Sequence, residues 1–356
     1  MITIGVDAHK RVHVAVAVDG AGREIAHWRG ANSVEGWQQL AQWAAALGET
    51  VHRGIEGAWN YGRGLAQYLL LHAATVYEVN PRWTAAGRQR ARRVDKNDRY
   101  DARAVALVVW REAPALTPLL IDEETAVLDL LITEREDAVA EATRLRNQLH
   151  QLLLQLDPDY AAHLPSLRSK AGLTTLAAYT TAEPSPIQQH RAGAVRRLAE
   201  RLGLAQRQAA DLATQIQALA APRFAPLTQI CGISLLTAAA LAGILGPGQR
   251  FTSDAQLAAY AGAAPLEASS AGRVRHRLNR GGNRRLNAIL YRIAVTQARC
   301  SPQAQAYLAR RAGEGKTRRE AIRALKRFIA RAIWRRWQEC AALVPDATAE
   351  CAPLAA

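Results

Sequence analysis

Apolar and polar residues alternate at the beginning of the chain, which is the spacing of a strand with one buried face. The run Met1 to Val6 is followed by a short turn and then by Val12 to Val18, and both runs are rich in β-branched residues. This pattern predicts a β-hairpin with Asp7 near its turn. A second alternating stretch, Val51 to Ile55, leads directly into Glu56. Two predicted strands therefore end on acidic residues.

Helical spacing separates the strands of the first 112 residues. Ser33 is placed to cap a helix that runs to Leu47 and carries apolar residues at intervals of three and four. Further helices are expected around Leu65 to His72 and from about Asp98, with a strand from Ala74 to Val79 between them. Strands that alternate with helices are typical of an α/β domain, and we expect this domain to occupy residues 1–112.

Two long stretches in the middle of the chain repeat apolar residues every three or four positions. The first runs from Leu128 to Leu156 and ends at Pro158, and the second runs from Val195 to Leu219. Repeats of this kind over three or more heptads favour a coiled coil, either between the two helices or between subunits. We expect a coiled-coil spacer and oligomerisation arm over residues 123–221. Two helices packed on an ordinary core are the alternative.

Glycine-punctuated helical sequence follows Pro222. The turn around Gly232 precedes an alanine-rich helix, and helix-hairpin-helix modules use such a turn to offer backbone N–H groups to phosphate. Small residues at this spacing also allow close helix packing. A basic amphipathic helix is expected from Thr317 to Trp337. The sequence thus predicts a mostly α-helical domain over residues 222–340, followed by a disordered tail at 341–356.

The composition indicates that nucleic acid is the partner. The 356 residues carry a formal net charge of +15 with an isoelectric point near 10.3, and a surface of that sign attracts phosphate polymers. No apolar run approaches the roughly 18 residues of a membrane span, and no signal pattern precedes the first strand. We expect a soluble intracellular protein that binds no membrane. The four cysteines lack the spacing of a zinc site or a disulfide framework.

Four acidic residues have the positions of a metal site: Asp7, Glu56, Asp98 and Asp101. Strand ends present side chains to ligands, and two aspartates three apart share one face of a helix. Two like charges about 4 Å apart repel by roughly 1 kcal/mol in water and about 4 kcal/mol at an effective dielectric of 20. Mg²⁺ removes that cost and prefers carboxylate, water and phosphate oxygens. We expect two Mg²⁺ ions, or Mn²⁺ instead, for chemistry on a phosphodiester. Taken singly, each acid also has the ordinary explanation of a helix cap or a solvated side chain.

Arginine is concentrated in two runs. The first run lies between Arg82 and Arg93 and either binds phosphate or is a solvated loop. In the second, between Arg273 and Arg285, alternate arginines on extended backbone would face one way and form an edge that binds phosphate. The arginines predicted to bind nucleic acid are Arg82, Arg88, Arg90, Arg92, Arg93, Arg273, Arg275, Arg277, Arg280, Arg284 and Arg285. Ser269 and Ser270 precede the second run, where positive charge would stabilise a serine alkoxide as a nucleophile on phosphorus. Most serines in such loops only cap or turn.

These segments, in this order, resemble the DEDD transposases of the insertion-sequence IS110 group, which are bridge-RNA-guided recombinases. The matching segments are Gly5-Val6-Asp7, Ile55-Glu56-Gly57, Asn80-Pro81, Asp98-Arg99-Tyr100-Asp101-Ala102-Arg103, Gly232-Ile233, Thr237-Ala238, Phe251, Tyr260-Ala261-Gly262, Pro265, Ser269-Ser270, Arg280-Gly281-Gly282-Asn283 and Arg284-Arg285-Leu286. The resemblance covers residues 1 to about 335. It implies an RNase H-like (RuvC-type) N-terminal domain that the coiled coil joins to a C-terminal transposase domain.

The resemblance also implies roles for single residues. Its catalytic and metal-binding tetrad would be Asp7, Glu56, Asp98 and Asp101. Ser270 would be the nucleophile that forms a covalent link to DNA. The usual Ser-Gly pair is replaced here by Ser-Ser-Ala-Gly, and the spacing from Pro265 favours Ser270 over Ser269.

The partners that the resemblance implies are donor and target DNA, a structured bridge RNA, and further copies of the chain in a dimer or tetramer. The compartment would be the bacterial cytoplasm, at the nucleoid. Two other functions stay open on the residues alone. One is a metal-dependent nuclease similar to a Holliday-junction resolvase, in which water attacks. The other is a non-catalytic nucleic-acid-binding protein with a degenerate tetrad.

Overall fold

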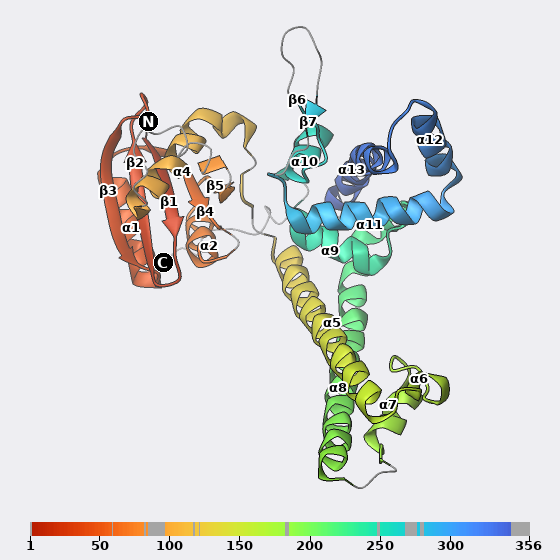
Figure 1. The fold of residues 1–356 in the computed structure, drawn as a ribbon. Helices are drawn as coiled ribbons and strands as arrows, with labels where there is room; N and C mark the ends of the chain where they lie inside the picture. Colours follow the sequence, from red (N-terminus) through yellow and green to blue (C-terminus); the bar gives the residue numbers. More distant parts are fainter. Residues whose placement is uncertain are drawn as a thin grey trace. The chain divides into compact units, whose positions relative to one another are not determined.

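The computed structural model describes residues 2–58, 60–81, 83–84, 97–116, 118–120, 122–181, 185–247, 250–267, 276–277 and 281–342. The chain divides into two compact units, whose elements are labelled in Figure 1. The first unit holds Met1–Glu123, Ile230–Gly232 and Leu245–Ala356, and the second holds Glu124–Gln229 and Ile233–Ile244.

A five-stranded sheet forms the N-terminal part of the first unit. Its strands are β1 (Ile2–Ala8), β2 (Val12–Val18), β3 (Glu24–Ala31), β4 (Thr50–Glu56) and β5 (Val76–Val79), in the order β3-β2-β1-β4-β5. The pairs β1–β2 and β2–β3 are antiparallel, whereas β1–β4 and β4–β5 are parallel. The predicted hairpin and the strands before Glu56 and Asn80 are confirmed. Strand β3 was not predicted, because its residues Glu-Ile-Ala-His-Trp-Arg-Gly-Ala are mixed in polarity and none is fully buried.

Helices cover both faces of this sheet. They are α1 (Val34–Ala46), α2 (Arg63–Leu71) and α4 (Asp98–Glu112), followed by the short 3-10 helix η1 (Ala113–Ala115). Ser33 caps α1 as predicted, because its Oγ accepts a hydrogen bond of 3.2 Å from the N–H of Gly36. Helices α1 and α2 share an apolar core with Ile4 and Val6 of β1. Helix α4 packs on the opposite face, against the valines of β2.

Glycine allows α4 to lie unusually close to β1. A Cβ atom built on Gly5 would come within 2.1 Å of the backbone nitrogen of Ala106 and 2.3 Å of the carbonyl oxygen of Ala102. A Cβ on Gly54, which pairs with Gly5 in β4, would come within 2.5 Å of a side-chain methyl of Val109 in the same helix. Only a residue without a side chain fits at these two positions. The helix start is thereby brought down onto the ends of the two strands.

Asn97 fixes where α4 begins. Its side-chain oxygen accepts a hydrogen bond of 3.0 Å from the N–H of Arg99, which is the geometry of a helix N-cap. We expect Asn97→Ala to lower the free energy of unfolding by about 1 kcal/mol, whereas Asn97→Ser retains a capping oxygen and most of the stability. Urea denaturation of the three proteins measures the difference. Equal stabilities for Asn97→Ala and the wild type would show that the cap is not needed.

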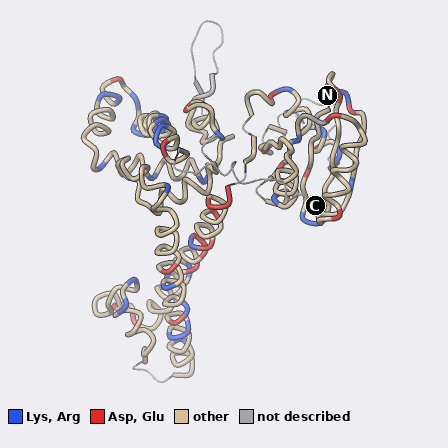
Figure 2. The backbone as a smooth tube through the Cα atoms, turned by 180° about the vertical axis from the view of Figure 1, so that it is seen from behind, with Lys and Arg blue, Asp and Glu red and all other residues tan. Residues whose placement is uncertain are grey.

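Two long helices dominate the second unit. Its elements are α5 (Glu123–Leu156), α6 (Tyr160–His163), α7 (Lys170–Ala177), α8 (Pro186–Phe224), the 3-10 helix η2 (Ala225–Gln229) and α9 (Leu235–Leu245). Buried residues of α5, such as Leu145 and Leu149, share one core with Val195 and Leu202 of α8, and Leu176 of α7 completes it. The two helices run side by side in Figures 1 and 2. Packing between the helices of one chain is therefore observed, and the oligomerisation arm stays a prediction. Helices α6 and α7 lie in the segment that connects these two long helices.

Charge is uneven along α5. Figure 2 shows acidic residues concentrated in the first part of this helix. Glu124 in that part accepts a hydrogen bond of 2.8 Å from the nearly buried Arg223 of α8.

Helices also make up the C-terminal part of the first unit. The elements are α10 (Asp254–Tyr260), the two-residue strands β6 (Leu266–Glu267) and β7 (His276–Arg277), α11 (Arg284–Cys300), α12 (Pro302–Gly313) and α13 (Arg318–Ala342). Asp254 ties α10 to α13, because its carboxylate accepts hydrogen bonds from Arg327 and Arg331 at 2.7 and 3.0 Å. The predicted amphipathic helix corresponds to α13. In the part of the chain that the structure describes, no helix is long and apolar enough to cross a membrane.

Candidate active site at the ends of β1 and β4

Two acidic residues lie next to each other at the edge of the sheet that is formed by the carboxyl ends of its parallel strands. Asp7 of β1 is the register partner of Glu56, the last residue of β4. Side chains two apart on a strand point to the same face. Asp7 therefore shares its face with Gly5, and Glu56 shares its face with Gly54. Because α4 packs directly on those two glycines, both acids belong to the face of the sheet that α4 covers.

The other two predicted acids lie in the first turn of α4. Asp101 is 7% exposed, as is Asp7, whereas the side chain of Asp98 is half exposed. Burial is the main cause that raises the pKa of Asp7 above its ordinary value. The electrostatic interaction with His9 lowers the pKa of Asp7, and the negative charge of Asp101 raises it further. The structure thus brings Asp101 within electrostatic range of Asp7.

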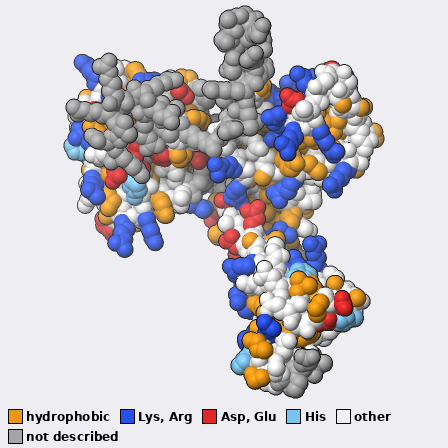
Figure 3. All heavy atoms as spheres, in the orientation of Figure 1, with side chains coloured by type: hydrophobic (Ala, Val, Ile, Leu, Met, Phe, Trp, Pro, Cys, Tyr) orange, Lys and Arg blue, Asp and Glu red, His pale blue; other side chains and the backbone are white. Residues whose placement is uncertain are grey.

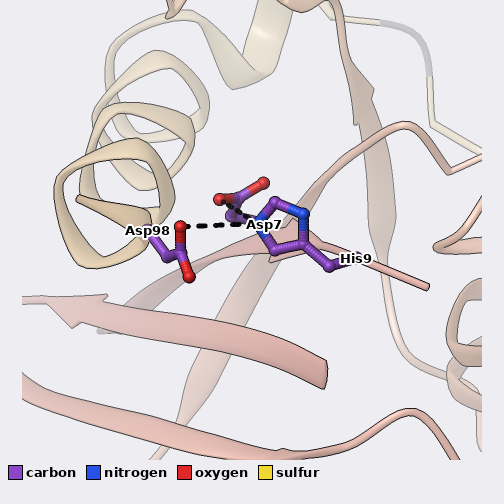
Figure 4. A group of neighbouring side chains, drawn as sticks. All are labelled: Asp7, His9 and Asp98. Carbon is purple, nitrogen blue, oxygen red and sulfur yellow. Dashed lines mark hydrogen bonds and ion pairs between the residues drawn. The ribbon is translucent and has the colours of Figure 1, made fainter. Parts of the chain in front are cut away.

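His9 connects the strand acid to the helix acid, as Figure 4 shows. Its Nε2 lies 3.0 Å from Oδ2 of Asp7 and 3.6 Å from Oδ1 of Asp98. The ligand atoms of these three residues all lie within 4.8 Å of one another. Sequence reasoning missed His9. The available signal was its spacing, since a histidine two residues after a strand-end aspartate stays on the same side of an extended chain.

Glu56 contacts Thr84 and is not part of the group around His9. Its two carboxylate oxygens each lie 3.5 Å from Oγ1 of Thr84, a fully buried residue whose hydroxyl also bonds the carbonyl oxygen of Pro81 at 2.8 Å. Among the described residues, Glu56 and Asp101 lie outside the three-residue group around His9. All four predicted acids nevertheless come from the same edge of the sheet and the helix start above it.

This set of side chains fits a divalent cation. Two carboxylates and an imidazole within ligand distance of one another are donors that Mg²⁺, Mn²⁺ and Zn²⁺ accept to different degrees. Asp98 and His9 are half exposed, so the group opens to solvent on one side. A substrate phosphate would therefore have access to it.

Most of the predicted nucleic-acid contacts lie outside the described residues. This holds for Ser269 and Ser270 and for Arg82, Arg88, Arg90, Arg92, Arg93, Arg273, Arg275 and Arg280. Arg277 belongs to β7, which pairs with β6 through Leu266. Arg284 and Arg285 are exposed in the first turn of α11. In Figure 3, Lys and Arg side chains gather on the C-terminal helices.

The two ends of the segment that contains both serines are fastened together. The backbone N–H of Asn283 donates to the carbonyl oxygen of Tyr260 at 2.7 Å, and its side chain donates to the Tyr260 hydroxyl at 3.0 Å. Asn287 bonds the carbonyl oxygen of Ala261 at 2.6 Å and accepts from the buried Lys326 at 2.8 Å. A Cβ on Gly282 would lie 2.2 Å from the backbone nitrogen of Gly262. This close contact accounts for the second glycine of the Gly-Gly-Asn motif, and the hydrogen bonds to Tyr260 account for its asparagine.

Comparisons with known proteins identify relatives of both halves. Residues 4–158 match the family model of the DEDD transposase of IS110, and residues 225–309 match the model described as Transposase IS116/IS110/IS902 family. An insertion element IS110 protein of 43.6 kDa from Streptomyces coelicolor is 31% identical over 279 residues, which are 65% of this chain and 68% of that protein. The putative mini-circle transposase for IS117 of the same organism is 30% identical over 47% of this chain and 41% of its own length. A probable family 20 transposase of Pseudomonas aeruginosa is 27% identical over 58% of this chain and 60% of its own length.

The acidic sheet edge and these matches define a DNA-acting enzyme of the transposase class. The chain belongs to the IS110 family of transposases. Its macromolecular partner is therefore DNA, and the DEDD designation of the family agrees with the use of divalent metal.

Proposed function

We propose that this transposase cleaves and rejoins DNA through a covalent serine–DNA intermediate, guided by a structured RNA. The observation that carries the proposal is the convergence at the sheet edge. Asp7 and Glu56 end adjacent parallel strands, and the helix turn that bears Asp98 and Asp101 packs over them. We assign these four acids as the catalytic, metal-binding tetrad. Mg²⁺ is the expected ion, with two ions bound.

The strand order supports an RNase H-like, RuvC-type assignment for residues 1–112. Three antiparallel strands are followed by two parallel ones, and helices cover both faces. We propose that residues 123–221 form the coiled-coil spacer and oligomerisation arm and that residues 222–340 form the C-terminal transposase domain. The segment at 341–356 is proposed as a disordered tail.

The proposed chemistry is a phosphoryl transfer to Ser270. The serine hydroxyl loses its proton, its Oγ forms a bond to phosphorus, and the ester bond to one deoxyribose oxygen breaks. That oxygen takes up a proton and leaves as a DNA hydroxyl. Rejoining is the reverse reaction with a hydroxyl from another strand, so that no external energy source is consumed. Divalent ions would stabilise charge on the phosphate and favour the serine alkoxide. The acids of the tetrad hold these ions in place.

Nucleic-acid partners follow from the charge and the family. A protein with a net charge of +15 neutralises many phosphates. We propose that donor and target DNA are selected by base pairing with the RNA, and that the arginine-rich runs hold the RNA by its shape and backbone. The tetrad of one subunit would act with the serine of another, which requires a dimer or a tetramer.

A trapping assay tests the proposal. Protein, RNA and end-labelled DNA are incubated with Mg²⁺, denatured in detergent and separated by size. We expect an adduct that survives denaturation in the wild type and in Ser269→Ala, and its complete loss in Ser270→Ala. An adduct in Ser270→Ala that is missing in Ser269→Ala would place the nucleophile one residue earlier. DNA cleavage without any adduct would show that water attacks, as in a resolvase.

A further inference from the structure

His9 lies where a cation ligand would lie. Ligands at about 2.1 Å from an octahedral ion are about 3.0 Å apart when they are neighbours and about 4.2 Å apart when they are opposite. The distance from His9 Nε2 to Asp7 is 3.0 Å and that to Asp98 is 3.6 Å. Both distances fall in the range for ligands of one ion. The imidazole nitrogen faces both carboxylates in Figure 4.

The backbone around His9 holds it in this position. Its N–H donates to the carbonyl oxygen of Val12 across the β1–β2 turn at 3.1 Å, and its own carbonyl oxygen accepts from the side chain of Asn32 at 3.4 Å. Asn32 also bonds the carbonyl oxygen of Lys10 at 3.3 Å and accepts from the Trp37 indole at 3.0 Å. The turn is therefore fastened to the end of β3 and to α1. These bonds fix the backbone from which the imidazole of His9 extends toward the two carboxylates.

We propose that His9 Nε2 is a direct ligand of the divalent ion that Asp7 and Asp98 hold, and that this nitrogen shifts the preference of the site from Mg²⁺ toward Mn²⁺. The inference rests on the proposed function, because it takes metal binding at this edge as given. Mg²⁺ selects oxygen ligands, whereas first-row transition ions accept imidazole nitrogen. In the neutral tautomer with its proton on Nδ1, the imidazole presents an Nε2 lone pair toward the two carboxylates.

The competing role for His9 is that of an orienting group. In that case Nε2 keeps its proton and donates a hydrogen bond to Asp7, while the metal binds carboxylate oxygens only. The two roles differ in one measurable respect, which is whether a nitrogen nucleus is bonded to the ion. Activity does not separate them, because loss of either role would slow the reaction.

Pulsed electron paramagnetic resonance of bound Mn²⁺ separates them directly. Untagged protein is loaded with less than one equivalent of Mn²⁺, and the ¹⁴N modulation from a coordinated imidazole is recorded. We expect this modulation in the wild type and in His72→Gln, which removes an exposed histidine at the end of α2. We expect it to be absent in His9→Gln. Calorimetry should show that His9→Gln weakens Mn²⁺ binding by at least the roughly 10- to 100-fold that loss of an outer-shell partner costs, and that it changes Mg²⁺ binding less.

Three other results of these experiments would each overturn one part of the proposal. Mn²⁺ that binds to the wild type without ¹⁴N modulation, or with a modulation that persists in His9→Gln, overturns the role of His9 and leaves the tetrad intact. An equal loss of Mg²⁺ and Mn²⁺ affinity in His9→Gln overturns the shift in preference. A wild-type protein that binds neither ion overturns this inference together with the metal requirement of the proposed function.

Discussion

Asp7→Asn is expected to abolish DNA strand cleavage and at the same time to stabilise the metal-free protein. Loss of one carboxylate from the ion-binding edge should lower the cleavage rate on the order of 10³-fold, since charge stabilisation at a reacting phosphate is commonly the largest single contribution to catalysis. Single-turnover cleavage of labelled DNA measures this loss. The amide retains the size of the side chain and can still bond Nε2 of His9, which lies 3.0 Å from Oδ2 of Asp7.

The effect of Asp7→Asn on stability follows from its raised pKa. The folded protein binds this proton more tightly than the unfolded chain, because burial and then Asp101 oppose the negative charge. The resulting stability is present below the unfolded-state pKa and is lost as the pH rises through the folded-state pKa. At neutral pH the ionised Asp7 therefore destabilises the metal-free fold. Thermal unfolding without metal should show a higher Tm for Asp7→Asn than for the wild type.

A matched variant and an added ion complete this test. Asp19→Asn removes a partly exposed carboxylate in the turn after β2 and should leave cleavage unchanged. Addition of Mn²⁺ should raise the Tm of the wild type and leave that of Asp7→Asn nearly constant, because binding to the folded state alone stabilises it. Full cleavage activity in Asp7→Asn would remove this residue from the catalytic set.

Gly5→Ala is expected to have the largest effect on stability of any single methyl addition in the sheet. The new Cβ would lie 2.1 Å from the backbone of α4 and 2.3 Å from a second backbone atom, so that the helix must move away from β1. Overpacking against rigid backbone costs about 3 kcal/mol. The shift would also carry Asp98 and Asp101 away from Asp7. We expect weaker metal binding and loss of cleavage in any fraction that stays folded.

Gly20→Ala is the control for this change. Gly20 lies in the turn after β2, and a Cβ there meets no atom within 4 Å. Urea denaturation should give wild-type stability for Gly20→Ala and a strongly lowered midpoint for Gly5→Ala. A small effect of Gly5→Ala would mean that α4 can shift at little cost, and the close approach would then not determine the geometry of the site.

Periodicity predicted the elements better than it predicted their packing. The hairpin, the cap at Ser33 and the two long helices follow from local patterns that the structure confirms. Strand β3 was not predicted, because its extended conformation depends on pairing with β2 and not on its own composition. The close approach at Gly5 could not be inferred, since a single glycine in a strand has several explanations.

The acids of the site were found from their places at strand and helix ends, and His9 was not. Each acid follows an element whose type the pattern reveals, so that its position could be inferred before its neighbours were known. The position of His9 depends on a turn that Asn32 fastens from a third strand, and only the folded chain shows that contact. The role of Ser270 rests on the family resemblance and that of the arginine runs on their charge and spacing, and both stay predictions.

The parallel pairing of β1 with β4 also determines when the acids can come together during synthesis on the ribosome. β1, β2 and β3 emerge in succession and can pair at once, but the free side of β1 waits for β4, some forty residues later. Asp7 lacks its neighbour Glu56 until then and lacks the helix acids until α4 has left the tunnel. A nascent chain can therefore bring the four acids together only after α4 has been made.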